Sequence, residues 1–374
     1  MPKQLLNINA LQHRFPISVI TGFLGSGKTT LLNKLLQYPT MQRAAVVINE
    51  FGNVGIDHLL VRAATEDIVL MDNGCLCCTI RGDMVATLQE LLHKRGQGDL
   101  PPFDRIIMET TGLADPAPII HTLLNDDNLK GLFHLDNVIT TVDGVYGLQQ
   151  LDQHYETVKQ SAVADVLIIT KTDLVAPSHL TALTQRLQKL NPAARIFHSG
   201  QGELEIGQLF RGKLYDPSTK HLDVQRWLQA DAYRTTQILQ LQPLSPLSSS
   251  NDHIRHDDYI RSFCIEYDQP LSWTVLNRWF QQLTALRGKD LLRTKGIVYT
   301  QETELPVLVQ GVQHIFQPPT TLDKWHIDPP RSQIVFITRN IGKPVLERML
   351  EVLIHSKTHI ESVAAALILL ENAA

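Results

Sequence analysis

The chain has 374 residues, which exceeds one ordinary domain, and 43% of them are hydrophobic, so we expect two domains with sizeable cores. The formal net charge is −4 and there is no run of Lys or Arg, which excludes nucleic acid as the main partner because phosphate contacts need a basic face. Residues 1–14 contain no apolar signal segment, and the apolar run Val363–Leu370 is too short to span a bilayer. We therefore expect a cytoplasmic protein with no membrane partner, and we interpret Val363–Leu370 as the core face of a last helix.

Strands and helices alternate along the first half of the chain. In chain order we expect strand Phe15–Thr21, helix Lys28–Leu36, strands Ala44–Ile48 and Asp67–Leu70, a helix with Met84, Val85, Leu88, Leu91 and Leu92 at helical spacing, strand Asp104–Met108, helix Pro116–Leu124, strands Val138–Val142 and Val166–Ile169, a helix with the stripe Leu180, Leu183, Leu187 and Leu190, and strand Arg195–Phe197. This alternation predicts an α/β fold, with a mostly parallel sheet and helices on both faces.

The composition changes at Gln242–Asn251, where Pro and Ser mark a linker. We expect a first domain over residues 1–212, a linker over 213–257 and a smaller α+β domain over 258–374. The expected elements of the last are strand Ile260–Tyr267, helix Leu271–Leu286, strands Gly296–Tyr299, Val307–Val312 and Ile334–Thr338, and helix Val345–Ile354. Trp273 and Trp279 lie on one of these helices and are expected to belong to the core.

Residues Gly22–Thr29 fit the P-loop pattern G-x-x-x-x-G-K-[ST] between an expected strand and an expected helix. A glycine loop turns backbone N–H groups toward phosphates, and the helix N-terminus adds positive charge. Lys28 would reach the β- and γ-phosphates, and the Thr29 hydroxyl would bind Mg²⁺. The predicted nucleotide contacts in this loop are Gly22, Gly25, Ser26, Gly27, Lys28, Thr29 and Thr30. The alternative is a glycine turn that matches the pattern by chance.

Two further segments follow expected strands and complete a nucleotide site. In Met108–Gly112, Glu109 would hold a magnesium-bound water and Gly112 would offer its N–H to the γ-phosphate; the alternative is a solvated glutamate. In Thr170–Asp173, Asp173 would accept the N1–H and N2–H of guanine, a donor pair that adenine lacks.

The aliphatic stem of Lys171 would lie along the base, and Ser199 is a weaker candidate for a contact to it. The alternative is a polar turn in which Asp173 caps the next element. On the first interpretation the nucleotide is GTP or GDP.

Three of the four cysteines lie within Gly74–Cys78, as Cys75, Cys77 and Cys78. Thiolates suit Zn²⁺ and other soft or borderline ions, but neighbouring cysteines rarely both bind one ion, so one of them can be a spare ligand. The candidate outside ligands are Glu50, His58 and Asp72, with His121 weaker. The alternatives are a buried thiol cluster or a redox disulfide, because this spacing is not that of a zinc finger.

Together these motifs resemble the CobW family of P-loop GTPases. The resemblance rests on Gly22–Thr30, on Asn49–Gly52, on the Gly-Cys-hydrophobic-Cys-Cys run at Gly74–Cys78 and on Glu109–Pro116. It covers about the first 210 residues strongly and the second domain more loosely, through Lys295-Gly296 and Gln310–Val312. Two features depart from the family: Thr170 stands where the guanine motif usually has Asn, and long His-rich stretches are absent.

The resemblance implies a SIMIBI-like P-loop GTPase that acts as a metallochaperone or metal-insertion factor, with Zn²⁺ the commonest cargo and Co²⁺ or Ni²⁺ the others. It implies slow hydrolysis with Lys28, Glu109 and Glu50 as catalytic residues, a switch at Asn49–Gly55, a client metalloprotein and, as in many switch GTPases, a homodimer. The residue that activates the attacking water is not identified. The alternatives are a P-loop ATPase or kinase acting on a small molecule, and a non-enzymatic zinc buffer or redox sensor.

Overall fold

The computed structural model describes residues 14–38, 41, 43–48, 82–100, 102–129, 131–200, 259–316, 319–325 and 328–355. These residues form two compact units, one built mainly on residues 14–185 and 194–200 and the other mainly on 259–355. The predicted domain boundaries fall outside the described residues and stay predictions. Within the described residues, no helix combines the length and the apolar composition needed to cross a membrane.

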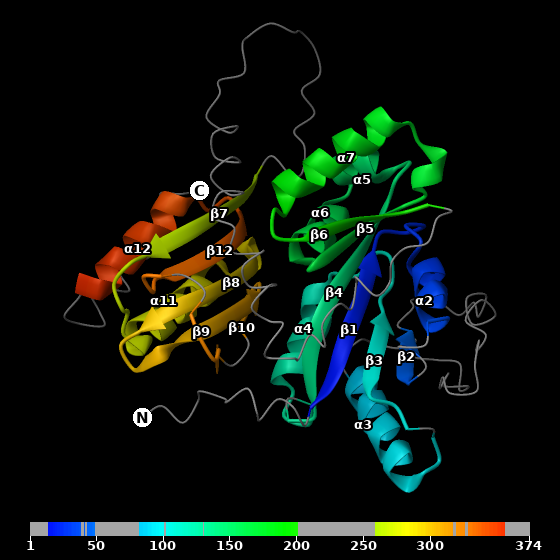
Figure 1. Ribbon diagram of the computed structural model, residues 1–374, viewed down its shortest axis with the longest axis horizontal. Helices are drawn as coiled ribbons and strands as arrows, with labels where there is room; N and C mark the ends of the chain where they lie inside the picture. Colours follow the sequence, from blue (N-terminus) through cyan, green and yellow to red (C-terminus); the bar gives the residue numbers. More distant parts are fainter. Residues whose placement is uncertain are drawn as a thin grey trace, which may run out of the picture. The chain divides into compact units, whose positions relative to one another are not determined.

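The first unit contains a six-stranded sheet in the order β2-β3-β1-β4-β5-β6, and each neighbouring pair is parallel (Figure 1). Its strands are β1 (Phe15–Gly22), β2 (Ala44–Ile48), β3 (Arg105–Glu109), β4 (Phe133–Asp143), β5 (Val166–Thr170) and β6 (Arg195–Ser199). The helices are α2 (Lys28–Leu36), α3 (Gly82–Gln97), α4 (Pro116–Asn125), α5 (Gly147–Gln153), α6 (Tyr155–Val163) and α7 (Pro177–Leu190), with a short 3₁₀ helix η3 (Thr172–Leu174).

Alternate residues of the central strands pack against helices on opposite faces of this sheet. Ile20 and Ile107 belong to a core with Leu31, Leu32 and Leu35 of α2. Their strand neighbours pack on the other face, where the core takes its helical members from α3 and α4; it includes Ile17, Val19, Ile106, Met108, Met84, Leu88, Leu91, Ile119 and Leu123. The predicted α/β fold with helices on both faces is confirmed.

The structure differs from the sequence-based expectation in two helices and in several element lengths. The bounds of α2 and β2 agree with the prediction, whereas β4 begins at Phe133 rather than Val138 because its early residues pair with β1. Helices α5 and α6 were not predicted. The expected strand Asp67–Leu70 and the last helix at Val363–Leu370 lie outside the described residues.

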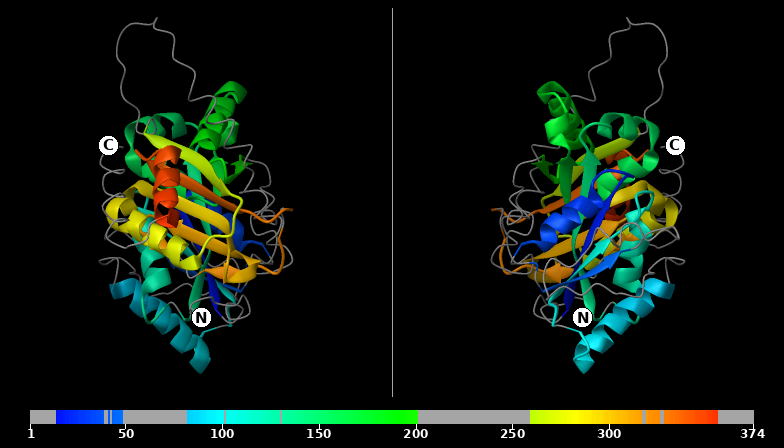
Figure 2. Two further views of the ribbon diagram at one scale, coloured as in Figure 1. Left: turned by 90° about the vertical axis from the view of Figure 1, so that its left-hand side faces the viewer. Right: turned by 90° about the vertical axis from the view of Figure 1, so that its right-hand side faces the viewer.

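The second unit has an antiparallel sheet in the order β10-β9-β8-β12-β7, with β11 paired to β9. Its elements are β7 (Ile260–Tyr267), α11 (Trp273–Arg287), η4 (Gly288–Asp290), β8 (Leu291–Thr300), β9 (Thr303–Val312), β10 (Ile315–Phe316), β11 (Thr320–Thr321), β12 (Ser332–Arg339) and α12 (Lys343–His355). Helices α11 and α12 cover one face of the sheet (Figure 2). Trp279 is fully buried between them and the sheet, and Trp273 packs at the edge of the same core, as predicted.

The apolar face of α3 provides a test of the core. We expect Leu88→Ala to lower the free energy of unfolding by about 2–5 kcal/mol, because Leu88 is fully buried and its truncation leaves a cavity. The neighbouring Gln89 is exposed, so Gln89→Ala is the control and should change the free energy of unfolding by less than about 0.5 kcal/mol. Urea denaturation followed by circular dichroism measures both. Equal effects of the two changes would contradict the assignment of Leu88 to the buried face of α3 and of Gln89 to its exposed face.

Candidate functional site

The P-loop joins the end of β1 to the start of α2, and its glycines adopt backbone angles that other residues rarely take. Gly25 and Gly27 have φ of 71° and 89°, in the left-handed region. Gly22 lies so close to β4 that an added Cβ would be 2.4 Å from the Thr141 carbonyl oxygen. Ser26 is fully buried, and its hydroxyl lies 2.7 Å from that of Thr141. The loop is therefore seated on the carboxyl end of β4.

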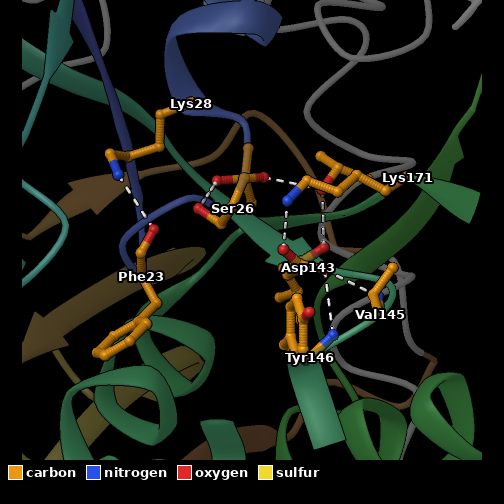
Figure 3. A network of polar contacts seen from close by, with 10 residues as sticks. Phe23, Ser26, Lys28, Asp143, Val145, Tyr146 and Lys171 are labelled. Carbon is orange, nitrogen blue, oxygen red and sulfur yellow. Dashed lines mark hydrogen bonds and ion pairs between the residues drawn. The ribbon is translucent and has the colours of Figure 1, made fainter.

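Lys28, the first residue of α2, turns back over the loop. Its ammonium donates a hydrogen bond of 3.2 Å to the carbonyl oxygen of Phe23, which also accepts the backbone N–H of Ser26 at 3.2 Å (Figure 3). Lys28 is only 8% exposed. The one cation of this loop is thus held at its centre, where the phosphates of a nucleotide would lie.

Thr29 and Glu109 meet at the carboxyl edge of the sheet. Glu109 ends β3, which pairs with β1 so that Ile20 and Glu109 are opposite each other. The Thr29 hydroxyl donates a hydrogen bond of 2.7 Å to Glu109 Oε1, and Glu109 is 5% exposed. The structure therefore brings together the hydroxyl and the carboxylate that the sequence assigned to a magnesium shell. Oxygen donors of this kind suit Mg²⁺.

The loop after β3 approaches the P-loop closely at Gly112. A Cβ on Gly112 would lie 2.6 Å from Leu24 Cδ2 and 2.7 Å from the Leu24 nitrogen. Only glycine fits between these atoms without displacing the P-loop backbone. Gly112 is thus beside the phosphate loop, as the sequence predicted for a residue that reads the γ-phosphate.

Thr170 ends β5 and connects the phosphate loop to the expected base-binding loop. Its hydroxyl donates to the carbonyl oxygen of Ser26 at 2.8 Å and to that of Val142 at 3.3 Å. It is 8% exposed. The Thr170 side chain therefore holds the P-loop against β4.

Asp143 is a site residue that the sequence analysis missed. It ends β4 and is 2% exposed; Oδ2 forms an ion pair of 2.6 Å with Lys171 Nζ, and Oδ1 accepts the backbone N–H groups of Val145 and Tyr146 at 2.8 and 3.1 Å (Figure 3). These bonds fix the ammonium of Lys171, and with it the stem that was expected to lie along the base. An acid directly after the predicted strand Val138–Val142 was the available signal.

Asp173 lies in η3, directly after β5, and is exposed. Its neighbour across the sheet edge is the end of β6, where Ser199 pairs with Thr170. A Cβ on Gly200 would lie 2.8 Å from Thr172 Oγ1 and 3.4 Å from Asp173 Oδ1. The structure therefore places Asp173 beside Ser199 and Gly200, while Ser199 itself is 8% exposed.

The predicted thiolate site lies outside the described residues, as do Glu50, His58, Asp72, Cys75, Cys77, Cys78 and the switch Asn49–Gly55. His121 is on α4, and no group of three or more His, Cys, Asp or Glu residues that could hold a metal occurs in the described part of the chain. Thr30 is exposed on the first turn of α2. The fourth cysteine, Cys264, is a buried residue of β7.

Two family models match the chain: the CobW/HypB/UreG nucleotide-binding domain over residues 16–198 and the cobalamin synthesis protein CobW C-terminal domain over 260–354. Zinc chaperone YjiA of Escherichia coli is 31% identical over 324 residues, which are 86% of this chain and 93% of that protein. Zinc-regulated GTPase metalloprotein activator 1 of Saccharomyces cerevisiae is 27% identical over 378 residues, covering 90% of this chain and 83% of that protein.

Among solved structures, the zinc-bound YjiA GTPase from E. coli matches 92% of this chain and 99% of its own, with a TM-score of 0.63 and 27% identity. The match therefore extends over both units. The chain belongs to the CobW family of P-loop GTPases.

Proposed function

We propose that this protein is a metallochaperone in which GTP binding and hydrolysis are coupled to the binding of a metal, Zn²⁺ first, and to its transfer to a client metalloprotein. The observation that carries the nucleotide half is the pairing of Thr29 with Glu109 beside the buried Lys28. The names of the relatives support the metal half, since they include zinc chaperones and zinc-regulated GTPase activators.

The contacts around the P-loop support a role in binding a nucleoside triphosphate. Lys28 now donates to the Phe23 carbonyl, and a phosphate oxygen is a stronger acceptor because it is charged. The lysine would therefore transfer to the β- and γ-phosphates. Bound Mg²⁺ would neutralise charge on the same oxygens, with Thr29 and Glu109 holding it directly or through water. The products are GDP and inorganic phosphate.

The position of Asp173 supports guanine as the base. Its carboxylate can accept two parallel N–H bonds from guanine, whereas adenine offers no such pair. The Lys171 ammonium forms its ion pair with Asp143, and Asp173 is exposed. Base recognition by Asp173 favours the GTPase over the alternative of a P-loop ATPase or kinase.

The cysteine run supports a transferable metal. Cys75, Cys77 and Cys78 lie between the P-loop and Glu109 in the sequence, on the part of the chain that switches in P-loop GTPases. A γ-phosphate that orders this segment would change the ligand geometry. Any such coupling is reciprocal, so GTP changes the affinity for metal by the factor by which metal changes the affinity for GTP.

Replacement of Asp173 tests base recognition. We expect Asp173→Asn to weaken GTP binding about 10- to 100-fold, since a hydrogen bond to a charged group contributes about 1.5–3 kcal/mol. Xanthosine triphosphate should bind the variant better than the wild type, because its C2 oxygen can accept from the new amide. Competition against a fluorescent nucleotide measures both affinities, with ATP as a third ligand. Asp127→Asn, at an exposed turn before β4, is the control. Wild-type preference for ATP would contradict the GTPase proposal.

Replacement of Glu109 tests the magnesium shell. Glu109→Gln removes the charge of the side chain while keeping its size. We expect the Mg²⁺ concentration for half-maximal GTP hydrolysis to rise about tenfold, because one charge-assisted contact is lost. Glu90→Gln, at a glutamate paired with Lys94 on α3, is the matched control and should leave it unchanged. An identical Mg²⁺ dependence in both variants would remove Glu109 from the site.

Zinc titration against a chelator tests the coupling. With wild-type protein, we expect different Zn²⁺ affinities in the presence of GDP and of a non-hydrolysable GTP analogue. Cys77→Ser should lower the affinity for Zn²⁺ at least about 100-fold. Loss of a residue that only supports a metal ligand lowers affinity by up to about 100-fold, and loss of a ligand itself should cost at least as much. Cys264→Ser is the control, because that thiol is buried in the second unit. Equal affinities for Zn²⁺ with both nucleotides would refute a GTP-gated metal site. Normal GTP hydrolysis by a protein that binds no Zn²⁺ would refute the metallochaperone function and retain the GTPase activity.

A further inference from the structure

Helix α6 contacts the loop that follows β3 and holds this loop through the buried side-chain amide of one glutamine. Gln160 is fully buried on this helix. Its Nε2 donates to two backbone carbonyl oxygens of the loop, Gly112 at 3.2 Å and Ala114 at 3.0 Å. The main-chain carbonyl oxygen of Gln160 accepts the hydroxyl of Thr140 on β4 at 2.8 Å, which ties the helix to the sheet.

The bonds of Gln160, together with bonds inside the loop, orient the N–H groups of the loop. In a planar trans peptide the C=O and the N–H point in opposite directions. Because the Gly112 carbonyl is turned toward Gln160, the N–H of Leu113 points away from α6. The carbonyl of Thr111 accepts the Thr110 hydroxyl at 3.2 Å and the N–H of Ala114 at 3.2 Å, so the N–H of Gly112 points away from these two donors. Gln160 holds the Gly112 and Ala114 carbonyls of the same turn.

The same helix holds the far end of the loop and touches the P-loop. Lys159 forms an ion pair of 3.0 Å with Asp115, whose other oxygen accepts the N–H of Ala117 at the start of α4. His154, which precedes α6, stacks on Phe23 of the P-loop with ring centroids 4.4 Å apart. Helix α6 and the residue directly before it therefore contact both the Gly112 loop and the phosphate loop.

We infer that Gln160 is a positioning residue that holds the Gly112 loop in the orientation that senses a γ-phosphate, so that discrimination of GTP from GDP depends on it. This inference rests on the proposed GTPase function. GDP lacks the γ-phosphate that the loop would contact, so its binding depends on the P-loop and the base site alone. The expected signature is a selective loss of affinity for the triphosphate.

Gln160→Met tests this role, because methionine has similar length and no amide. We expect the affinity for a non-hydrolysable GTP analogue to fall about tenfold, since a hydrogen bond to a charged group is weakened, while the affinity for GDP stays within about twofold. Gln160→Glu should have a larger effect in the same direction, because a carboxylate would face two carbonyl oxygens. Gln149→Met, at an exposed glutamine of α5 paired with Gln153, is the matched control.

Isothermal titration with GDP and with the analogue, at one Mg²⁺ concentration, gives the ratio of affinities for each variant. An unchanged ratio in Gln160→Met, or an equal loss for both nucleotides, overturns the inference, because a merely structural residue would affect both alike. If Gln160→Met does not fold, Lys159→Met decides: it removes the ion pair to Asp115 and should lower the same ratio, and an unchanged ratio overturns the inference. Failure of wild-type protein to prefer GTP over ATP counts against the proposed function instead, and equal wild-type affinity for GDP and the analogue counts against the role of Gln160.

Discussion

The position of β1 between β3 and β4 is the constraint on which the site depends. All three strands are parallel, so the loops that leave their carboxyl ends meet at one edge of the sheet. The strand order also changes direction at β1, because β3 lies on one side of it and β4 on the other. The pairing of Ile20 with Glu109 sets the acid beside the loop that leads to Thr29, and the pairing of Gly22 with Thr141 seats the P-loop on β4. A change of one residue in either register would turn alternate side chains to the opposite face and separate these groups.

The sequence predicted those elements whose apolar residues carry a clear period or whose ends carry a clear signal. Helix α2 is one example, since Gly27 takes a left-handed conformation directly before Lys28 and the leucines that follow are buried. Helix α6 shows the opposite case. Thr157, Gln160 and Ser161 are buried alongside Val158, Ala162 and Val163, so its inner face is half polar and carries no clear apolar period. Besides the adjacent α5, it packs against β1 and β4 and bonds the loop after β3, and no local pattern reveals these distant contacts.

The same reason separates the residues that the sequence singled out from Asp143 and Gln160, which it did not. The P-loop, Glu109 and Asp173 lie in short motifs in which spacing alone indicates phosphate and base chemistry. Asp143 and Gln160 bond to partners 28 and 46–48 residues away, and only the folded chain brings these groups together. Thr170 is intermediate: its place in a base-binding motif was recognised, but its bond to the Ser26 carbonyl required the structure.

The buried carboxylate of Asp143 also has a consequence for amide exchange with solvent. The N–H groups of Val145 and Tyr146 belong to a turn, where exchange is usually fast, yet both are held by this one oxygen. Their exchange with deuterium therefore requires the carboxylate to leave them, and the same movement strains its pair with Lys171. Two turn amides thus report, without any added label, on the opening of the loop that carries Lys171.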